Sequence, residues 1–484
     1  MSELLNLEPK GLWKHFDKIC SIPHPSKHEE KIVAALVEFA KANNIEYKVD
    51  ETGNVIMRKP ASKGMENRKG VILQAHVDMV PQKNNDTKHD FEKDPILPRI
   101  NGEWVCATGT TLGADNGIGA SAALAVLEDK ELVHGPIEAL FTIDEETGMT
   151  GAFGLKAGEL NGDILLNLDS ETEGELYVGC AGGVDATIRF DFKKEAMPAG
   201  YQALTMSVKG MKGGHSGMDI ILGRGNANKT LFRVLKALEK FDCRLGEING
   251  GSLRNAIPRE AFCTIAIPTA KLSEAKAEVK NFESIVKNEL SAVEPDVTIS
   301  LEETCSCSFL IDQDTARRVI RTVYACPNGI YRMSDSMENL VETSSNLAIV
   351  KTEGEQIVAC ALLRSSVDTA KADFAEMMAS VVELAGGKIE FTGGYPGWKP
   401  NMHSPILETM TATYKKLFGR TPKVMAIHAG LECGLLGGVY KNWDMISFGP
   451  TIKHPHSPDE KVNINSVKLF WDYLTETLKN VPTK

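Results

Sequence analysis

Three short and almost continuously apolar segments constrain the fold of this chain more than any other feature of its sequence. They are residues 70–77, 137–143 and 163–168. Runs of this length and composition are typical of parallel strands that are buried on both faces. A helix of small residues is expected between the first two, at residues 117–129. The alternation of strand and helix predicts an α/β domain with a parallel sheet covered on both sides.

This pattern changes near Gly182-Gly183 and returns after the turn-rich segment 393–398. Between these points, strand-like and helical segments follow one another in two similar cycles, which suggests two tandem α+β units. We therefore predict that residues 1–183 and 396–484 form one α/β domain, and that residues 184–395 are inserted into it as an α+β domain.

Charge and cysteine content exclude several classes of protein. The chain has 54 basic and 65 acidic residues, a net charge of −11, which argues against a nucleic-acid-binding surface. No apolar stretch approaches the roughly 20 residues of a membrane span, and no secretory signal is visible at the N-terminus. The ten cysteines are dispersed without a C-x-x-C pair, as expected for reduced thiols, although Cys305-x-Cys307 leaves a redox role open. We expect a cytoplasmic protein with neither nucleic-acid nor membrane partners.

Five polar motifs stand out because most of them follow predicted strands. They are residues 74–80, 112–119, 142–148, 166–171 and 450–460. Ligands of open α/β sheets gather at the carboxyl ends of the strands. His76 and Asp78 are two positions apart on a strand, so their side chains leave the same face. A carboxylate in this position can orient an imidazole for metal binding.

Each motif alone has a simpler explanation. His76 and Asp78 could form a strand-end salt bridge, and Glu145-Glu146 could be a solvated loop. The glycine-rich segment 112–119 is neither G-x-G-x-x-G nor a P-loop. Together, however, the motifs supply histidine and carboxylate ligands without cysteine, which suits Zn²⁺, Co²⁺ or Mn²⁺ better than a structural zinc site. Several acids in one cleft also need cations to stay ionised, and two divalent ions would provide them.

The order of these motifs is also specific. H-V-D-M-V, G-A-D-N-G-I-G, D-E-E-T-G, L-D-S-E and H-S-P-D-E follow one another along the chain. In this the sequence resembles the co-catalytic di-zinc peptidases of the aminoacylase and carboxypeptidase-G type. K-G-G-H-S-G-M-D-I, R-N-A-I-P-R-E and I-H-A-G-L-E-C-G extend the similarity to nearly the full length. More narrowly, the chain resembles the bacterial aminoacyl-histidine (Xaa-His) dipeptidases, also called cytosolic non-specific dipeptidases.

The resemblance implies an α/β/α sandwich catalytic domain with a lid as the inserted domain, and a centre of two metal ions, zinc first and cobalt or manganese as alternatives. The implied metal ligands are His76 and Asp169 for one ion, Glu146 and His456 for the other, and Asp115 as the bridge. His456 is preferred to His454 because it directly precedes Ser-Pro-Asp-Glu. The resemblance also implies a cis peptide bond after Asp115, Glu145 as the general base, and Asp78 as the residue that orients His76.

For substrate binding, the resemblance implies that His215 contacts the scissile carbonyl oxygen and that Asn255 helps to bind the substrate. Arg364 has the planar donors that fit a C-terminal carboxylate, and its simpler role is a salt bridge within the lid. His428, Gly430 and Glu432 resemble substrate-pocket residues, with Glu432 facing a substrate ammonium group.

We therefore expect a metallodipeptidase that hydrolyses unblocked dipeptides, including Xaa-His and β-alanyl-histidine. A metallo-deacylase of N-acyl amino acids is the main alternative. A metal-free binding protein is disfavoured because every ligand position is filled, and a serine hydrolase because no G-x-S-x-G motif is present. The sequence leaves open whether the chain forms a homodimer.

Overall fold

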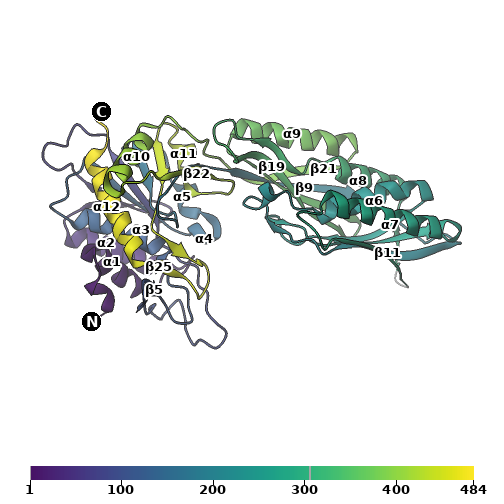
Figure 1. Cartoon of the computed structure of the whole chain (residues 1–484), viewed down its shortest axis with the longest axis horizontal. Coiled ribbons are helices and arrows are strands. Elements are labelled where there is room, and N and C mark those ends of the chain that lie inside the picture. The colour runs from purple at the N-terminus through teal and green to yellow at the C-terminus, as the bar shows by residue number, and fades with distance from the viewer. Residues whose placement is uncertain (1, 305–306) are drawn as a thin grey trace. The chain divides into compact units, whose positions relative to one another are not determined.

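The structure is a computed structural model that describes residues 2–304 and 307–484. It consists of two compact units. Unit 1 comprises Met1–Gly179, Pro400–Ala426 and Leu431–Lys484, and unit 2 comprises Cys180–Lys399 and Ile427–Gly430. In Figure 1 the colours of unit 1 run from purple to blue and from light green to yellow, and unit 2 is mainly teal and green.

One assignment from the sequence is wrong. All of residues 396–484 were placed in the first domain, whereas Ile427–Gly430 group with unit 2. The physical reason is a long-range contact: the amide of Ala181 donates to the carbonyls of Ile427 and Ala429. The unit boundaries otherwise fall at Gly179 and Pro400, close to the sequence boundaries after residue 183 and before residue 396.

Unit 1 is built around an eight-stranded sheet. Its strands, in spatial order, are β1 (Glu46–Val49), β2 (Val55–Lys59), β6 (Ile137–Thr142), β3 (Val71–His76), β7 (Ile164–Asn167), β23 (Asp444–Ser447), β8 (Glu175–Cys180) and β22 (Lys423–Ile427). The four central strands β6, β3, β7 and β23 are parallel. Every residue of β3, β6 and β7 is buried, so both faces are covered. The predicted α/β class is confirmed, although β2 and β8 run antiparallel to the central strands, and β1 pairs antiparallel with β2.

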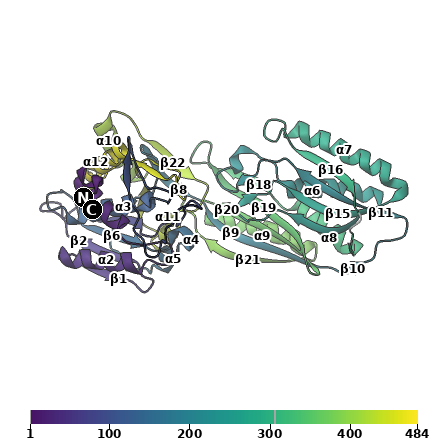
Figure 2. The same ribbon diagram turned by 90° about the horizontal axis from the view of Figure 1, so that it is seen from below.

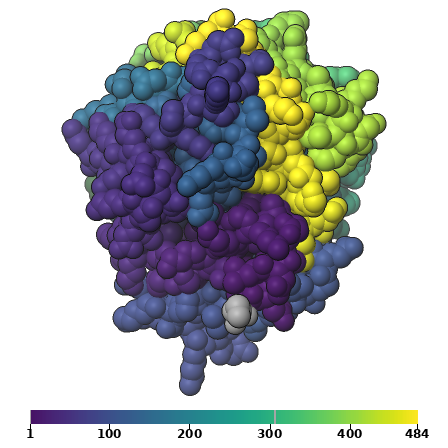
Figure 3. Space-filling view, turned by 90° about the vertical axis from the view of Figure 1, so that its left-hand side faces the viewer, coloured from purple at the N-terminus to yellow at the C-terminus, as the bar shows by residue number. Residues whose placement is uncertain are grey.

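Helices flank this sheet. They are α1 (Lys10–Cys20), α2 (Glu30–Ala42), α3 (Ala114–Glu128), α4 (Glu145–Gly148), α5 (Thr150–Gly154), α10 (Pro405–Phe418), α11 (Glu432–Val439) and α12 (Ile464–Asn480), with the 3₁₀ turn η1 (Glu3–Asn6). The C-terminal residues return to the early part of the chain, because the amide of Lys69 donates to the carbonyl of Pro482. Figure 3 shows these yellow residues beside purple and blue segments.

A small sheet in unit 1 connects two distant loops. Its order is β24 (Ile452–Lys453), β25 (Lys461–Asn463), β5 (Trp104–Cys106) and β4 (Arg99–Asn101). β24 and β25 form a hairpin whose loop contains residues 454–460. β25 also pairs with β5, which precedes the segment leading into α3. The hairpin is thereby attached to the segment that delivers Asp115.

Unit 2 contains a nine-stranded sheet. Its main path is β16 (Thr298–Glu303), β11 (Tyr201–Lys209), β15 (Ala261–Pro268), β13 (Arg244–Gly250), β19 (Val341–Glu353), β20 (Gln356–Ser365), β9 (Gly182–Asp191) and β21 (Lys388–Tyr395), and β18 (Gly329–Met333) pairs with β19. The helices are α6 (Ala227–Leu238), α7 (Leu272–Glu289), α8 (Gln313–Ala325) and α9 (Asp368–Leu384). Short elements are β10 (Lys194–Glu195), β12 (Gly214–His215), β14 (Ala256–Ile257), β17 (Leu310–Ile311), η2 (Ile220–Leu222), η3 (Glu239–Phe241) and η4 (Thr269–Lys271).

The sheet of unit 2 consists of two halves with the same topology. One half runs β11-α6-β13-β15-α7-β16 and the other β9-α8-β19-β20-α9-β21, so each is a β-α-β-β-α-β unit. The halves meet where β13 pairs with β19, and Figure 2 shows their strands in one continuous sheet. β9 precedes the first half in the chain and the rest of its own half follows it, so the first half is nested within the second. The sequence predicts two tandem units, and this tandem arrangement is wrong.

None of the helices in the described part of the chain is long and apolar enough to span a membrane. Most of the nine cysteines among the described residues are buried. Cys305 of the C-x-C pair lies outside the described residues.

Candidate metal centre

The predicted ligands of unit 1 meet at one edge of its sheet. His76 is the last residue of β3, and Glu145 and Glu146 follow β6, which is parallel to β3 with His76 beside Thr142. Asp169 follows β7, whose Asn167 lies beside Gln74 of β3. Because parallel strands end at the same edge, short apolar strands are sufficient to bring these side chains together.

His76, Asp115 and Asp169 form the first group of ligands. The Nε2 atom of His76 lies 3.2 Å from Oδ1 of Asp115 and 3.4 Å from Oδ1 of Asp169. The peptide bond between Asp115 and Asn116 is cis, as the resemblance implied. Asn116 donates a side-chain hydrogen bond to the carboxylate of Asp169 and thereby connects the two acids.

Asp115, Glu146 and His456 form the second group. The Nε2 atom of His456 lies 3.2 Å from Oδ2 of Asp115 and 3.0 Å from Oε2 of Glu146. Asp115 therefore presents one carboxylate oxygen to each histidine, which is the geometry of a bridging ligand. His454 belongs to no ligand group among the described residues.

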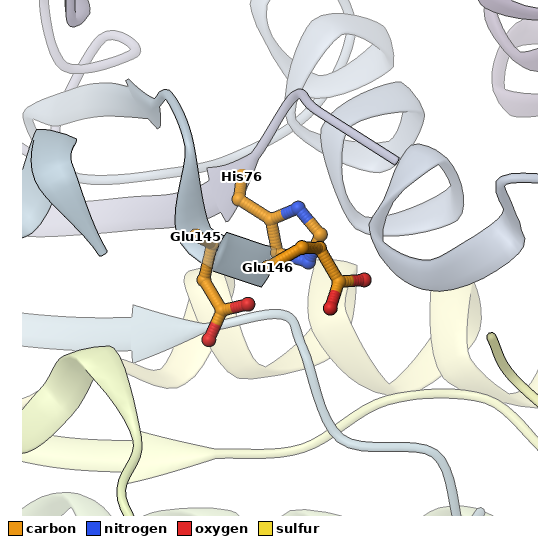
Figure 4. Close-up of side chains that lie close together, drawn as sticks. All are labelled: His76, Glu145 and Glu146. Carbon is orange, nitrogen blue, oxygen red and sulfur yellow. The ribbon is translucent and has the colours of Figure 1, made fainter. Parts of the chain in front are cut away.

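Glu145 lies beside both groups. One ligand atom each of His76, Glu145 and Glu146 falls within 4.8 Å of the others. Figure 4 shows the two carboxylates and the imidazole close together beyond the end of β3. A carboxylate in this position is within reach of a water molecule held at the centre.

Asp78 contacts His76 on the ring nitrogen that faces away from the other acids. Its Oδ1 atom lies 3.3 Å from Nδ1 of His76, so the opposite ring nitrogen faces the acids. The Asp78 carboxylate also accepts hydrogen bonds from Ser26 and from the amides of Glu145 and Glu146. Burial opposes its ionisation, but the contact with His76 and these hydrogen bonds prevail and lower the pKa of Asp78 to about 2. Asp78 thus stays charged and supports His76 as a ligand.

The pKa values of the ionisable groups in the site show how the clustered acids affect one another. Burial, together with the neighbouring Asp115, raises the pKa of Asp169 to about 6. Burial and the acids around it raise the pKa of Glu145 well above its ordinary value. Hydrogen bonds to Asp115 and Glu146 raise the pKa of His456 to about 11. Protons therefore occupy positions that a divalent cation would take, and the histidine–carboxylate donor set fits zinc, cobalt or manganese.

Glu432 is the first residue of α11 and is 2% exposed. Its Oε2 atom accepts hydrogen bonds from Gln74 at 2.5 Å and Thr142 at 3.0 Å, whereas Oε1 has no partner. Burial, with an added contribution from Asp169, raises the pKa of Glu432 to about 7. The structure therefore brings Glu432 to the metal ligands of unit 1.

His215 belongs to unit 2, on the two-residue strand β12, and pairs with Ala256 of β14. Its Nδ1 atom accepts hydrogen bonds from the amides of Gly217 and Met218 at 3.2 and 3.0 Å. An accepting Nδ1 requires the proton of the neutral ring to be on Nε2. Burial, followed by the charge of Arg364, lowers the pKa of His215 and favours this neutral form. His215 is thus set to donate from Nε2.

Arg364 is also in unit 2 and is 5% exposed. Its guanidinium donates to the hydroxyls of Ser216 at 3.4 Å and Tyr395 at 3.1 Å, and forms no ion pair with any described residue. His428 lies nearby and has its Nε2 atom 2.7 Å from the hydroxyl of Ser344. Burial, followed by the charge of Arg364, lowers the pKa of His428 to about 3. A buried arginine that forms no ion pair with the described residues can bind an anion.

The two remaining predicted residues have weaker structural support. Asn255 is exposed, and its carbonyl accepts a hydrogen bond from the amide of Ser216. Asn346 holds the same loop by donating to the carbonyls of Arg254 and Ala256. Gly430 closes the short segment that groups with unit 2.

Sequence reasoning missed Gln74, Ser216, Ser344 and Tyr395, which contact predicted site residues. It assigned no role to Glu460, although this residue ends the H-S-P-D-E motif. The motifs that contain Gln74, Ser216 and Glu460 were visible in the sequence. No local signal marked Ser344 or Tyr395.

Comparisons with known proteins agree with this geometry. The sequence profile of "Peptidase family M20/M25/M40" matches residues 72–480. The chain is 51% identical over 485 residues to the cytosol non-specific dipeptidase of Escherichia coli (strain K12), covering 100% of both chains.

Solved structures are also similar. The aminoacylhistidine dipeptidase of Vibrio alginolyticus superposes with a TM-score of 0.97 at 53% identity, over 100% of this chain and 99% of that one. Aminopeptidase PepT from Bacillus cereus has a TM-score of 0.57 at 17% identity, over 98% and 99% of the two chains, and shares the fold.

Proposed function

Because the chain belongs to peptidase family M20/M25/M40, we propose that it is a metal-dependent dipeptidase that hydrolyses unblocked dipeptides, including Xaa-His and β-alanyl-histidine. The observation that carries this proposal is the pair of ligand groups that share Asp115. The names of the relatives from E. coli and V. alginolyticus support the choice of dipeptides and of histidine at the second position.

Two divalent ions fit the donors of unit 1. His76 and Asp169 would hold one ion, Glu146 and His456 would hold the other, and Asp115 would be shared by both. We propose zinc as the metal, with cobalt and manganese as substitutes, because the donors are nitrogen and oxygen without sulfur. When bound, such ions lower the pKa of a water molecule and polarise the scissile carbonyl.

Glu145 is the general base in this proposal. It takes a proton from the attacking water and returns it to the nitrogen of the leaving amine, so one carboxylate serves both steps. Its raised pKa in the absence of cations comes from burial and neighbouring acids, and positive charge at the centre lowers it towards the range of a base. Asp78 acts through His76 as a positioning residue.

His215 and Arg364 bind the substrate. The Nε2 proton of His215 stabilises the negative charge that develops on the carbonyl oxygen. Arg364 binds the C-terminal carboxylate, which supplies an ion-pair partner for the guanidinium. His428, whose charged form is disfavoured because burial depresses its pKa, lies near Arg364. Asn255 contributes its side chain and Gly430 its backbone to the same substrate.

Glu432 receives the free amino group of the substrate. Its Oε1 atom is buried without a hydrogen-bond partner, and an ammonium group would supply one. An unblocked dipeptide carries both an ammonium group for Glu432 and a carboxylate for Arg364, whereas an acetylated peptide lacks the ammonium group. A metallo-deacylase would accept a blocked amine, so the unpaired oxygen of Glu432 favours the dipeptidase.

The test is the hydrolysis of Ala-His, β-Ala-His, Ala-His-Ala and N-acetyl-Ala-His by metal-loaded protein. We expect kcat/KM for the unblocked dipeptides to exceed that for the extended and acetylated peptides by about 10- to 100-fold, the value of a charge-assisted hydrogen bond. Equal or faster cleavage of N-acetyl-Ala-His would establish the deacylase instead.

Arg364→Gln provides the matched variant. It should reduce the preference for dipeptides over Ala-His-Ala, because the carboxylate then has no charged partner. Arg189→Gln is the control, since Arg189 is a partly exposed residue of unit 2 that pairs with Glu390. An unchanged preference in Arg364→Gln would show that the carboxylate binds elsewhere.

We also propose a cytosolic location, on the strength of the name of the E. coli relative. A homodimer is compatible with this function, and the chemistry proposed above uses residues of one chain.

A further inference from the structure

Glu460 is the most heavily hydrogen-bonded carboxylate near the metal ligands. It is 2% exposed. Its Oε2 atom accepts from the amides of Leu112 and Gly113 at 2.7 and 3.0 Å, and its Oε1 atom from the amides of Ala114 and Asp115 at 2.8 and 3.2 Å. Four consecutive backbone donors therefore converge on one side chain.

Two of these donors, Leu112 and Gly113, precede α3, and the other two, Ala114 and Asp115, are its first residues. The backbone of Asp115 is not helical, with φ of −82° and ψ of 106°. Buried amides outside a regular helix or sheet need acceptors from elsewhere, and leaving them without one is costly. Glu460 supplies these acceptors from a distant part of the chain. It thereby fixes the backbone of Asp115, the residue shared by the two ligand groups.

Glu460 is fixed at its other side to the loop of His456. Its amide donates to the carbonyl of Ser457 at 2.9 Å, and β25 begins at the next residue. The side chain of His456 is 53% exposed, so surrounding side chains hold it only loosely. The loop of His456 is instead held by the β24–β25 hairpin and by the carboxylate of Glu460.

We infer that Glu460 is a positioning residue that sets the spacing between Asp115 and His456, and so keeps the Asp115–Glu146–His456 group at a metal-binding distance. This inference rests on the metal centre of the proposed function and not on its substrate. Asp169 and His76 are held by other contacts, through Asn116 and Asp78. Loss of Glu460 should therefore affect one metal site more than the other.

The experiment titrates metal-free protein with Zn²⁺ in a calorimeter, and with Co²⁺ while the visible absorption is recorded. Wild-type protein should bind two ions per chain. In Glu460→Gln, which keeps the size but removes the charge and two acceptor positions, one binding event should weaken by about 10- to 100-fold, as is usual when a residue that supports metal ligands is lost. The other event should weaken less, because its remaining ligands, His76 and Asp169, are held by Asp78 and Asn116.

Asp459→Asn is the matched control, because Asp459 is the exposed neighbour on the same loop and loses the same charge. It should bind both ions as wild type does. Glu460→Asp keeps the charge but is one methylene shorter, so it should give an intermediate loss of metal affinity. If thermal unfolding of the metal-free protein shows that Glu460→Gln does not fold, Glu460→Asp takes its place.

Two full-affinity binding events in Glu460→Gln would overturn the inference, and so would an equal weakening of both events. Wild-type protein that binds two ions but cleaves no dipeptide would refute the proposed function and leave the role of Glu460 intact. Wild-type protein that binds no metal would refute both.

Discussion

Asp115 determines the character of the centre at the scale of single residues. Its two oxygens face two histidines from opposite ends of the chain, at 3.2 Å each. The acids around it have raised pKa values because they are buried together. Cations and protons therefore compete for the same atoms, so metal binding should weaken as the pH falls.

Glu145→Gln tests the general base. The amide keeps the size of the side chain but cannot take up a proton, so we expect kcat to fall by at least about 100-fold while two metal ions remain bound. Turnover of a dipeptide and elemental analysis of the same sample measure both quantities. Normal turnover would move the role of the base to another residue.

His456→Ala and His454→Ala separate the two histidines of the hairpin loop. Only His456 lies near other ligands, 3.0 Å from Glu146, so its loss should remove or weaken one metal ion. His454→Ala should retain both ions and serves as the control. Equilibrium dialysis against Zn²⁺ gives the count, and the reverse order would show that His454 is the ligand.

At the scale of elements, α3 connects the core to the site. Almost all of its residues are buried, and small side chains let it approach β3 and α1 closely. A Cβ atom on Gly119 would lie 2.1 Å from the side-chain oxygen of Asn116 and 2.6 Å from the carbonyl of Leu168. Asn116 supports Asp169, so the packing of this helix also bears on a metal ligand.

Gly119→Ala should therefore destabilise the protein. Replacement of glycine by alanine within a helix usually stabilises by about 0.5–1 kcal/mol, but here we expect a loss of about 1–3 kcal/mol from overpacking. Gly11→Ala in α1 is the control, because its Cβ would make an ordinary contact at 3.6 Å with Ala125. Urea unfolding of the metal-free proteins gives both values, and stabilisation by Gly119→Ala would contradict the packing.

At the scale of the whole molecule, the chain divides into units with different tasks. All predicted metal ligands are in unit 1, whereas His215 and Arg364 are in unit 2, which has a hydrophobic core of its own. Ligands that bind only the folded state stabilise the part of the protein that holds them. The units should therefore respond differently to metal removal.

Chelation should lower the unfolding temperature of unit 1 and leave that of unit 2 nearly unchanged. An ion present at about 1,000 times its dissociation constant stabilises by about 4 kcal/mol, so the shift should be readily measured. Scanning calorimetry of chelated and zinc-restored protein, with activity assayed in parallel, tests this. Equal shifts of both transitions, or full activity without metal, would contradict the assignment.

The central strands, and the residues that the structure groups as candidate metal ligands, could be predicted from the sequence. Apolar runs identified β3, β6 and β7, because complete burial leaves a continuous local signal. The ligand motifs could be recognised because each consists of adjacent residues at a strand end.

Only the tertiary structure decided which distant segments pair. β19 was not predicted because its buried residues 342–346 are all polar, so their burial leaves no apolar pattern. The nesting of the two halves of unit 2, the place of Ile427–Gly430 and the role of Glu460 depend on contacts between remote positions. Glu460 and Leu112 are 348 positions apart, and no local pattern encodes a hydrogen bond that forms only when both loops are folded.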